Sequence, residues 1–239
     1  MIERLSSLWT YLQTLPVFWL VLTLGIYQLS ARLARRVHGF PLAHPVGLSI
    51  LALVLILYAT DTPYEHYFAG GQWIHALLAP ATVALAVPLY QQKERIRSLF
   101  IPLLTTLTIG SLLAIIASVG IGWMLGASPS SLLSLAPKSA TAPVAMGIAE
   151  KVGGIPSLTA AVVILTGITG AVGAPWVLDR LSIHEPAVRG FAMGLASHGV
   201  GTARAFQESE QTGAFAGLGM GLNALMTAVL VPVLYGLMV

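Results

Sequence analysis

The sequence contains no cysteine, and only 9% of its 239 residues are charged. The absence of cysteine excludes disulfides, catalytic thiolates and thiolate metal sites. Soluble domains contain about 25% charged residues, so the scarcity of charge together with a hydrophobic share of 56% is typical of a membrane protein. The formal net charge of +3 is small and comes from scattered Lys and Arg, so we do not expect nucleic-acid binding.

The sequence also lacks a signal-peptide cleavage pattern and a polar stretch long enough for a soluble domain. The first apolar run, residues 15–29, is followed by "ARLARR" rather than by a small-residue cleavage site. We therefore expect a retained first span and one integral membrane domain over residues 1–239, whose N-terminal spans lie within residues 8–60.

Apolar stretches long enough to cross a bilayer recur along the whole chain. A spanning helix needs about 20 mostly apolar residues, and the candidates are residues 8–29, 45–60, 73–90, 101–124, 158–178 and 214–237. Two further apolar stretches, residues 131–149 and 190–206, are interrupted by Gly, Ser, Thr and Pro. We predict an all-α, polytopic membrane protein in which these two segments are discontinuous or re-entrant. Tryptophans near the span ends suggest positions at the membrane surface: Trp9, Trp19, Trp73, Trp123 and Trp176.

The distribution of basic residues favours a re-entrant path for the first interrupted segment. Short cytoplasmic loops are enriched in Lys and Arg, and residues 32–36 and 93–97 form two such basic loops. Arg180 and Arg189 fall on the cytoplasmic side, together with these two basic loops, only if residues 131–149 enter and leave the membrane on one side. Irregular backbone at that depth requires surrounding protein or a water-filled cavity.

Three stretches of the chain resemble one another. They begin at Leu78, Leu135 and Leu195, which are 57 and 60 residues apart (135−78 and 195−135). Each passes from a small-residue segment through a short charged stretch into a long apolar helix, which predicts repeat-like units over residues 73–125, 131–182 and 190–239. Interrupted segments at matching positions of inverted repeats indicate the binding site of a secondary transporter. The alternative is chance similarity between Ala-rich sequences.

The few ionisable residues within the interrupted segments are cationic. Lys138 and His198 each lie three residues after the shared leucine, and Arg204 follows in the third unit. A cation at the centre of a spanning helix costs about 2.5–3.5 kcal/mol or more, so such a residue is a functional candidate. The alternative is that each pairs with a carboxylate or carbonyl and holds helices together. Because no Asp or Glu lies at comparable depth, a cationic lining predicts an anionic ligand.

The residue types around these cations suit recognition of a carboxylate. A half-helix N-terminus presents free N–H groups and a positive dipole end to an anion, and hydroxyls and Arg donate hydrogen bonds to it. The predicted substrate-binding residues are Lys138, Ser139, Thr141, Ser197, His198, Gly201, Thr202 and Arg204. The predicted breaks in the helices are Pro137, Pro143 and Gly199.

Enzymatic and metal sites are not expected. Lys138 and Ser139 are adjacent, which on a helix would direct them about 100° apart and prevent a Ser-Lys dyad. The histidines lack metal-ligand spacing, so we predict no metal and no cofactor. Glu208 and Glu210 are expected to cap the last helix. The alternatives are that they accept a coupling proton or that they pair with Arg204.

The strings "LAPKSATAPVAMGIAE", "GIPSLTAAVVILTGITGAVGAP" and "RGFAMGLASHGVGTARAFQ" resemble the LrgB/CidB family of bacterial membrane proteins over nearly the whole chain. The resemblance implies one of two functions. Bacterial members are named as antiholin-like partners of the small LrgA/CidA proteins and are linked to murein hydrolase export and cell lysis. Plastid relatives, which fuse an LrgA-like and an LrgB-like part, transport glycolate and glycerate. The positions that match the family are Pro137, Lys138, Ser139, Ser197, His198, Gly201, Thr202 and Arg204.

These observations lead to an expected function and its rivals. We expect secondary transport of a small anionic hydroxy-carboxylate across the bacterial inner membrane, with protons as a conceivable coupling ion and alternating access through motion of one repeat-built bundle. An LrgA/CidA-like membrane partner and a homo-oligomer are expected. The rivals are an antiholin-like regulatory subunit and an ion channel or proton antiporter.

Overall fold

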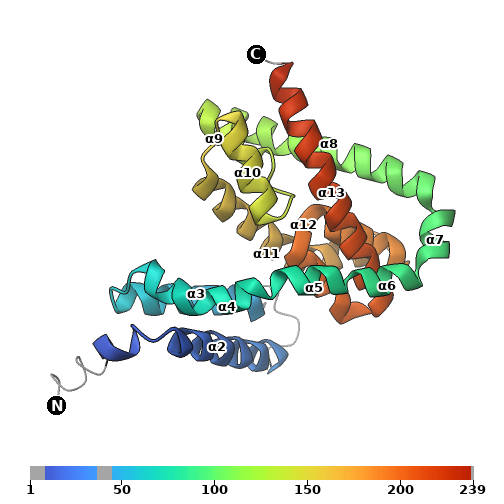
Figure 1. Cartoon of the computed structure of the whole chain (residues 1–239). Coiled ribbons are helices and arrows are strands. Elements are labelled where there is room, and N and C mark those ends of the chain that lie inside the picture. Colours follow the sequence, from blue (N-terminus) through green and yellow to red (C-terminus); the bar gives the residue numbers. More distant parts are fainter. Residues whose placement is uncertain (1–8, 37–44, 238–239) are drawn as a thin grey trace. The chain divides into compact units, whose positions relative to one another are not determined.

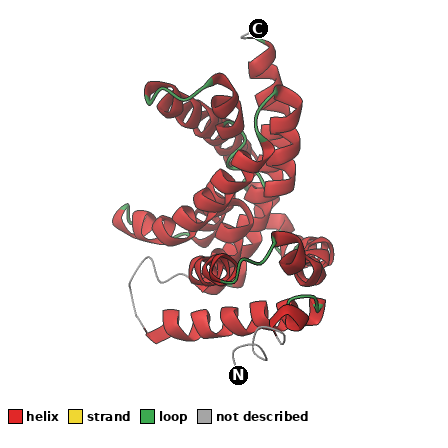
Figure 2. Ribbon diagram, turned by 90° about the vertical axis from the view of Figure 1, so that its left-hand side faces the viewer, coloured by secondary structure: helices red, strands yellow, loops and turns green. Residues whose placement is uncertain are grey.

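The computed structural model describes residues 9–36 and 45–237, and this described part is helical, with no strand (Figure 2). Within it, four helices are long and apolar enough to cross a bilayer: α2 (Pro16–Arg36), α8 (Phe100–Met124), α11 (Pro156–Arg180) and α13 (Glu210–Gly236). A fifth apolar helix, α3 (Pro45–Ala59), is shorter. The prediction of an all-α, polytopic membrane protein is confirmed.

The chain forms two compact units, Met1–Ala84 and Leu85–Val239, and each is described by itself. The predicted single membrane domain stays a prediction.

The first unit is built around one buried tryptophan. In it α2 packs against α3 and α4 (Tyr64–Ala76). The Trp19 ring is fully buried and meets Trp9, Phe18 and Tyr67 edge to face, and its indole N–H donates to the carbonyl of Gln13. Trp19 is thus a core residue of the first unit. Trp73, Trp123 and Trp176 are exposed, and the place of the five tryptophans at the membrane surface stays a prediction.

Two predicted spans differ from the structure. Residues 73–90 are not one helix, because α4 is followed by the short helices α5 (Leu78–Ala84) and α6 (Ala86–Gln91), and then by α7 (Lys93–Ser98). Pro80 and Pro88 lie in α5 and α6, and proline removes a backbone donor and clashes with the preceding turn. The first span begins at Pro16 rather than at residue 8, and it continues through the basic stretch to Arg36.

In the second unit, α8 and α13 run parallel to each other and α11 runs in the opposite direction. Ser111 of α8 bonds to Asn223 of α13. Further along both helices, Ile115 lies in one cluster with Val231. α11 has the opposite direction, because Val163 near its start lies in one cluster with Ala224, whereas Leu178 near its end lies in one cluster with Ala216, which is closer to the start of α13. These three helices are the frame that holds both interrupted segments.

The first interrupted segment reverses direction, as predicted. It consists of α9 (Pro129–Leu135), a non-helical turn and α10 (Ala142–Val152). The backbone N–H of Ile155 donates to Ser134 Oγ over 2.7 Å, although the two residues are 21 apart in sequence. A continuous helix would separate them by about 31 Å. Figure 1 shows α9 and α10 beside the end of α8 and toward the C-terminal end of α13.

The second interrupted segment, α12 (Pro186–Glu208), also reverses. Ser197 and His198 have non-helical dihedral angles, so α12 is two helices joined at a sharp turn. The guanidinium of Arg189 makes two hydrogen bonds of 2.9 and 3.1 Å to Glu208, 19 residues later, where one straight helix would hold them about 28 Å apart. The predicted discontinuity at residues 190–206 is therefore confirmed, and its path is a helical hairpin.

The two hairpins enter the frame from opposite ends. The first lies by the end of α8 and the start of α11, since Ser118 donates to the carbonyl of Leu135 and Thr159 donates to that of Ser134. The second lies by the end of α11 and the start of α13. Opposite orientation is what inverted repeats would produce, but the internal symmetry itself stays a prediction.

Candidate functional site

The turns of the two hairpins meet at the middle of the long helices. Asn223 is the central residue of α13, and its Nδ2 donates to the carbonyl of Ser139 in the first turn (3.0 Å) and to that of Leu195 before the second (3.1 Å). Ser111, near the middle of α8, donates to Asn223 Oδ1 over 2.7 Å. If the long helices cross the bilayer, both turns lie near its midplane.

His198 occupies the second turn in a strained conformation. Its φ of 42° and ψ of −134° lie in a region that favours glycine, and such strain costs about 1–3 kcal/mol for other residues. The imidazole Nε2 lies 2.9 Å from the carbonyl oxygen of Val163, which only accepts, so Nε2 carries a proton. This bond pins the turn to α11. The predicted break at Gly199 is wrong by one residue, since the positive φ falls on His198.

Lys138 lies in the first turn, half-buried, with its ammonium 3.4 Å from Ser139 Oγ. The expectation that Lys138 and Ser139 point apart is wrong, because it assumed a helix that ends at Leu135. Ser139, the neighbour of Lys138, is joined through Asn223 to Leu195 of the other hairpin. Among the residues that the structure describes, no carboxylate pairs with Lys138.

Ser197 places an unpaired hydroxyl at the same meeting point. Its side chain is 1% exposed, and its Oγ has no hydrogen-bond partner among the described residues. The hydroxyl lies over Gly170 of α11, where a β-carbon would overlap it. Burying a hydroxyl without a partner costs free energy, so Ser197 is a donor that a ligand could use.

Other predicted site residues have structural partners. Thr202 donates to the carbonyl of His198 over 2.9 Å, so its proton is already used within its own helix. Gly201 packs against the Met193 carbonyl, which leaves no space for a side chain. Thr141 precedes α10 without a side-chain cap bond.

The two prolines of the first hairpin have different roles. Pro137 is buried in the turn itself. Pro143 lies in the first turn of α10, where it begins a helix rather than breaking one.

Arg204 lies on the second half of α12, six residues after His198 and therefore about 9 Å further along the helix. It is half-buried, and no hydrogen bond or ion pair of Arg204 is found in the described ranges 9–36 and 45–237. That Arg204 and Lys138 line one cavity stays a prediction.

Glu208 pairs with Arg189, so the structure does not support the alternative in which it pairs with Arg204. Arg189 also donates to Asp179 at the end of α11 (2.6 Å) and to the carbonyl of Ile183 (2.9 Å). This arrangement closes the base of the second hairpin and ties it to α11. Glu210 lies in the first turn of α13, and Ser209 caps that helix by accepting from the N–H of Thr212.

Replacing Arg189 with methionine is expected to lower the free energy of unfolding by about 2–3 kcal/mol, because Glu208 is left largely buried without a partner. The same change at Arg95, whose pair with Glu185 is about half exposed on both sides, is the matched control and should cost less than about 1 kcal/mol. Denaturant unfolding of both purified variants checks this. Equal losses would show that the base of the hairpin is not held by Arg189.

Sequence reasoning missed the side chains that hold the turns. Asn223, Ser111 and Thr159 are each at most 1% exposed and make their hydrogen bonds to the two hairpins or to one another. For Asn223 and Ser111 the available signal was a polar residue in the middle of a long apolar helix, which at membrane depth faces the bundle interior.

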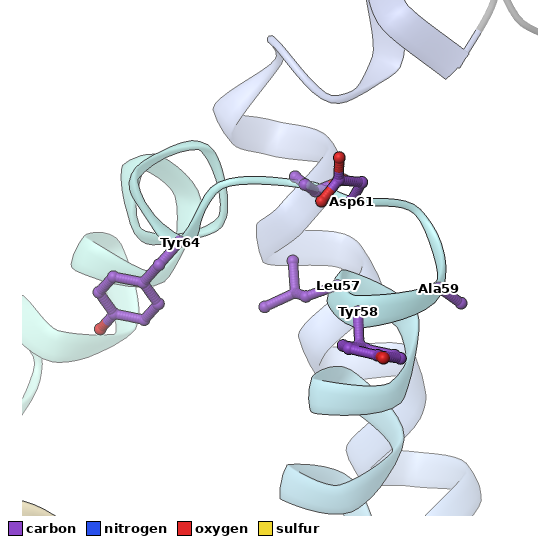
Figure 3. A pocket seen from close by; sticks show the side chains of 6 residues that line it. Leu57, Tyr58, Ala59, Asp61 and Tyr64 are labelled. Atoms are coloured by element: carbon purple, nitrogen blue, oxygen red, sulfur yellow. The ribbon is translucent and has the colours of Figure 1, made fainter.

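The first unit contains a surface hollow that shares no residue with this site (Figure 3). It is lined by Leu57, Tyr58, Ala59, Asp61, Thr62 and Tyr64, none of which was predicted as a site residue. Its charged group, Asp61, would repel an anion. In the described part of the chain, no three His, Asp or Glu side chains are placed to hold a metal ion.

Residues 23–237 match the LrgB-like family. The uncharacterized protein YwbG of Bacillus subtilis is 34% identical over 92% of this chain and 97% of its own length. The holin-like protein CidB of Staphylococcus epidermidis is 31% identical over 94% and 96% of the two chains. The antiholin-like protein LrgB of Bacillus cereus is 29% identical over 91% and 94%. No solved structure matches this chain.

Proposed function

Because this chain belongs to the LrgB-like family of membrane proteins, we propose that it is a secondary transporter of a small organic anion of the hydroxy-carboxylate class. The proposed location is the bacterial cytoplasmic membrane. The proposal includes no catalytic step and no cofactor.

The observation that carries the proposal is the environment of Lys138. Its ammonium lies at the meeting point of two hairpins, at the middle of the long helices, and no described carboxylate neutralises it. A cation at that depth without a partner is costly. A substrate carboxylate that enters the site would supply the missing negative charge.

The backbone supports the same proposal. α10 begins at Ala142 and the second half of α12 begins just after His198, so both helices have their N-termini at the meeting point. The N-terminus of a helix carries a partial positive charge and free N–H groups. Half-helices that meet near the midplane hold the substrate in several families of secondary transporters.

The neighbouring side chains suit a hydroxyl next to the carboxylate. Ser197 has a free hydroxyl, and His198 has a free Nδ1 when neutral, since its Nε2 is bound to Val163. Ser139 accepts from Lys138 and keeps its own proton. Arg204 is proposed to bind the carboxylate when the substrate leaves Lys138. Because the Thr202 hydroxyl already donates to the carbonyl of His198, its oxygen can only accept a hydrogen bond from the substrate.

Transport is tested with purified protein in liposomes. We expect saturable uptake of radiolabelled glycolate that is absent from protein-free liposomes, and competition by excess unlabelled glycerate but not by an uncharged diol of similar size. An imposed pH gradient tests proton coupling. Uptake equal to that of protein-free liposomes, with and without an LrgA-like protein, would contradict transport.

A second candidate is a holin-like component that acts with a small membrane partner. The names of two relatives, "holin-like" and "antiholin-like", fit this candidate better than they fit transport. In this case Lys138 would hold helices together or bind the partner. Co-purification with an LrgA-like protein, together with release of a trapped dye from liposomes containing both proteins, would favour it. A homo-oligomer is compatible with both candidates.

A further inference from the structure

We propose that Asn223 locks the turns of the two hairpins to each other, so that they keep one relative position and move as one body. This role concerns the framework of the second unit, and it holds whether or not the protein transports an anion.

The carboxamide of Asn223 uses both its donors and its acceptor. Nδ2 donates to the carbonyls of Ser139 and Leu195, and Oδ1 accepts from Ser111 and lies 3.5 Å from the hydroxyl of Thr227. Because carbonyls only accept and hydroxyls can donate, this network allows one orientation of the amide. Asn223 is fully buried, so water cannot replace these partners.

Both carbonyls need a donor from outside their own hairpin. In a continuous helix, the carbonyl of Leu195 would accept from the N–H of residue 199, but Ser197 and His198, which lie between them, have non-helical angles. Ser139 lies in the non-helical turn between α9 and α10. An unpaired carbonyl at membrane depth is strongly unfavourable, and Asn223 pairs one from each hairpin.

The consequence is mechanical. If one turn moved away from the other, a carbonyl and an amide N–H would both lose their partners in an apolar environment. Ser111 limits rotation of the carboxamide from the opposite side. The two turns are therefore coupled through one side chain of α13, although they belong to segments far apart in sequence.

The absence of cysteine makes the test simple, because one introduced cysteine is the only thiol. Ala140→Cys reports on the first turn and Ser197→Cys on the second, since both side chains are almost fully buried. The rate of labelling by N-ethylmaleimide is measured in membranes for each probe, with Asn223 and with Asn223→Leu, which keeps the branching of the side chain and removes its polar atoms. We expect slow labelling with Asn223 and at least about tenfold faster labelling of both probes with Asn223→Leu.

Three further variants keep the test decisive. Thr227→Val is the matched control, since its contact with Asn223 is long, and it should leave both rates unchanged. If Asn223→Leu does not fold, Asn223→Asp keeps the shape and replaces the donating amide by an acceptor, so it should open both turns. Ser111→Ala should give a smaller acceleration of both probes. Unchanged rates in the Asn223 variants, or acceleration at one turn while the other stays protected, would overturn the proposal.

Discussion

Replacing Gly194 with alanine is expected to lower the free energy of unfolding by at least about 3 kcal/mol, the largest effect of any small substitution considered. Gly190 and Gly194 lie one turn apart on the face of α12 that packs against α13. A β-carbon at Gly194 would overlap the carbonyl oxygen of Ala216, and one at Gly190 would overlap that of Thr212. Because the obstacle is backbone, no side-chain rotation relieves it, and α12 must move away from α13.

The matched control for this change is Gly221→Ala. Gly221 lies in α13, and a β-carbon there would meet no atom of another element within 4 Å, so alanine should be neutral or should stabilise the helix by up to about 1 kcal/mol. Thermal unfolding in detergent, followed by intrinsic fluorescence, compares the two variants. Equal unfolding midpoints would show that the close packing of α12 on α13 does not limit stability.

Replacing Lys138 with methionine is expected to reduce glycolate uptake about 100-fold while leaving the yield and unfolding of the protein unchanged. Removing the charged partner of a carboxylate in a desolvated site costs about 2–5 kcal/mol of binding free energy. A 100-fold reduction corresponds to about 2.8 kcal/mol, which lies within this range. Stability should not suffer, because the described residues offer Lys138 no carboxylate whose pairing would be lost.

Lys151→Met is the control for this change. Lys151 is exposed in the last turn of α10, so its loss removes the same charge from the same hairpin without touching the meeting point. Full uptake by Lys138→Met would exclude Lys138 from the substrate site. A sharp loss of folded protein in Lys138→Met alone would favour the alternative in which this lysine holds helices together.

The path of the interrupted segments was predictable because it depends on local composition. α9 ends just before Pro137, because proline lacks the backbone N–H that would continue the helix. The positions of the arginines favoured a first segment that returns to the side of the membrane from which it entered. Lys138 and His198 were proposed as site residues because ionisable residues are rare at such positions. The structure places both in turns.

Regular apolar runs were less reliable guides to helix boundaries. Residues 73–90 carry enough apolar side chains for a span, but Pro80 and Pro88 divide them. Trp19 matched the usual position of a surface tryptophan, yet the surrounding rings of α2 and α4 bury it. A hydropathy count records only how apolar the side chains are. The continuity of a helix also depends on its backbone N–H donors, and the burial of a side chain depends on the segments that pack around it.

The partners of the site residues could not be found by reading along the chain. Glu208 was expected to cap the last helix, with a pair to Arg204 as an alternative, but it binds Arg189, which is distant in sequence. The Gly190 and Gly194 pair had a recognisable spacing, since small residues four apart let helix backbones approach. Its contact with Ala216 became visible only once α12 and α13 were packed together.

The sequence by itself determined that this is an α-helical membrane protein, that two segments are interrupted, and that cations lie within them, because composition, proline and charge act through the local chain and its solvent. The tertiary structure decided which groups meet: Asn223 with both turns, His198 with Val163, and Arg189 with Glu208. Hydrogen bonds and ion pairs act over about 3 Å, so they depend on how distant segments pack, which no local pattern records.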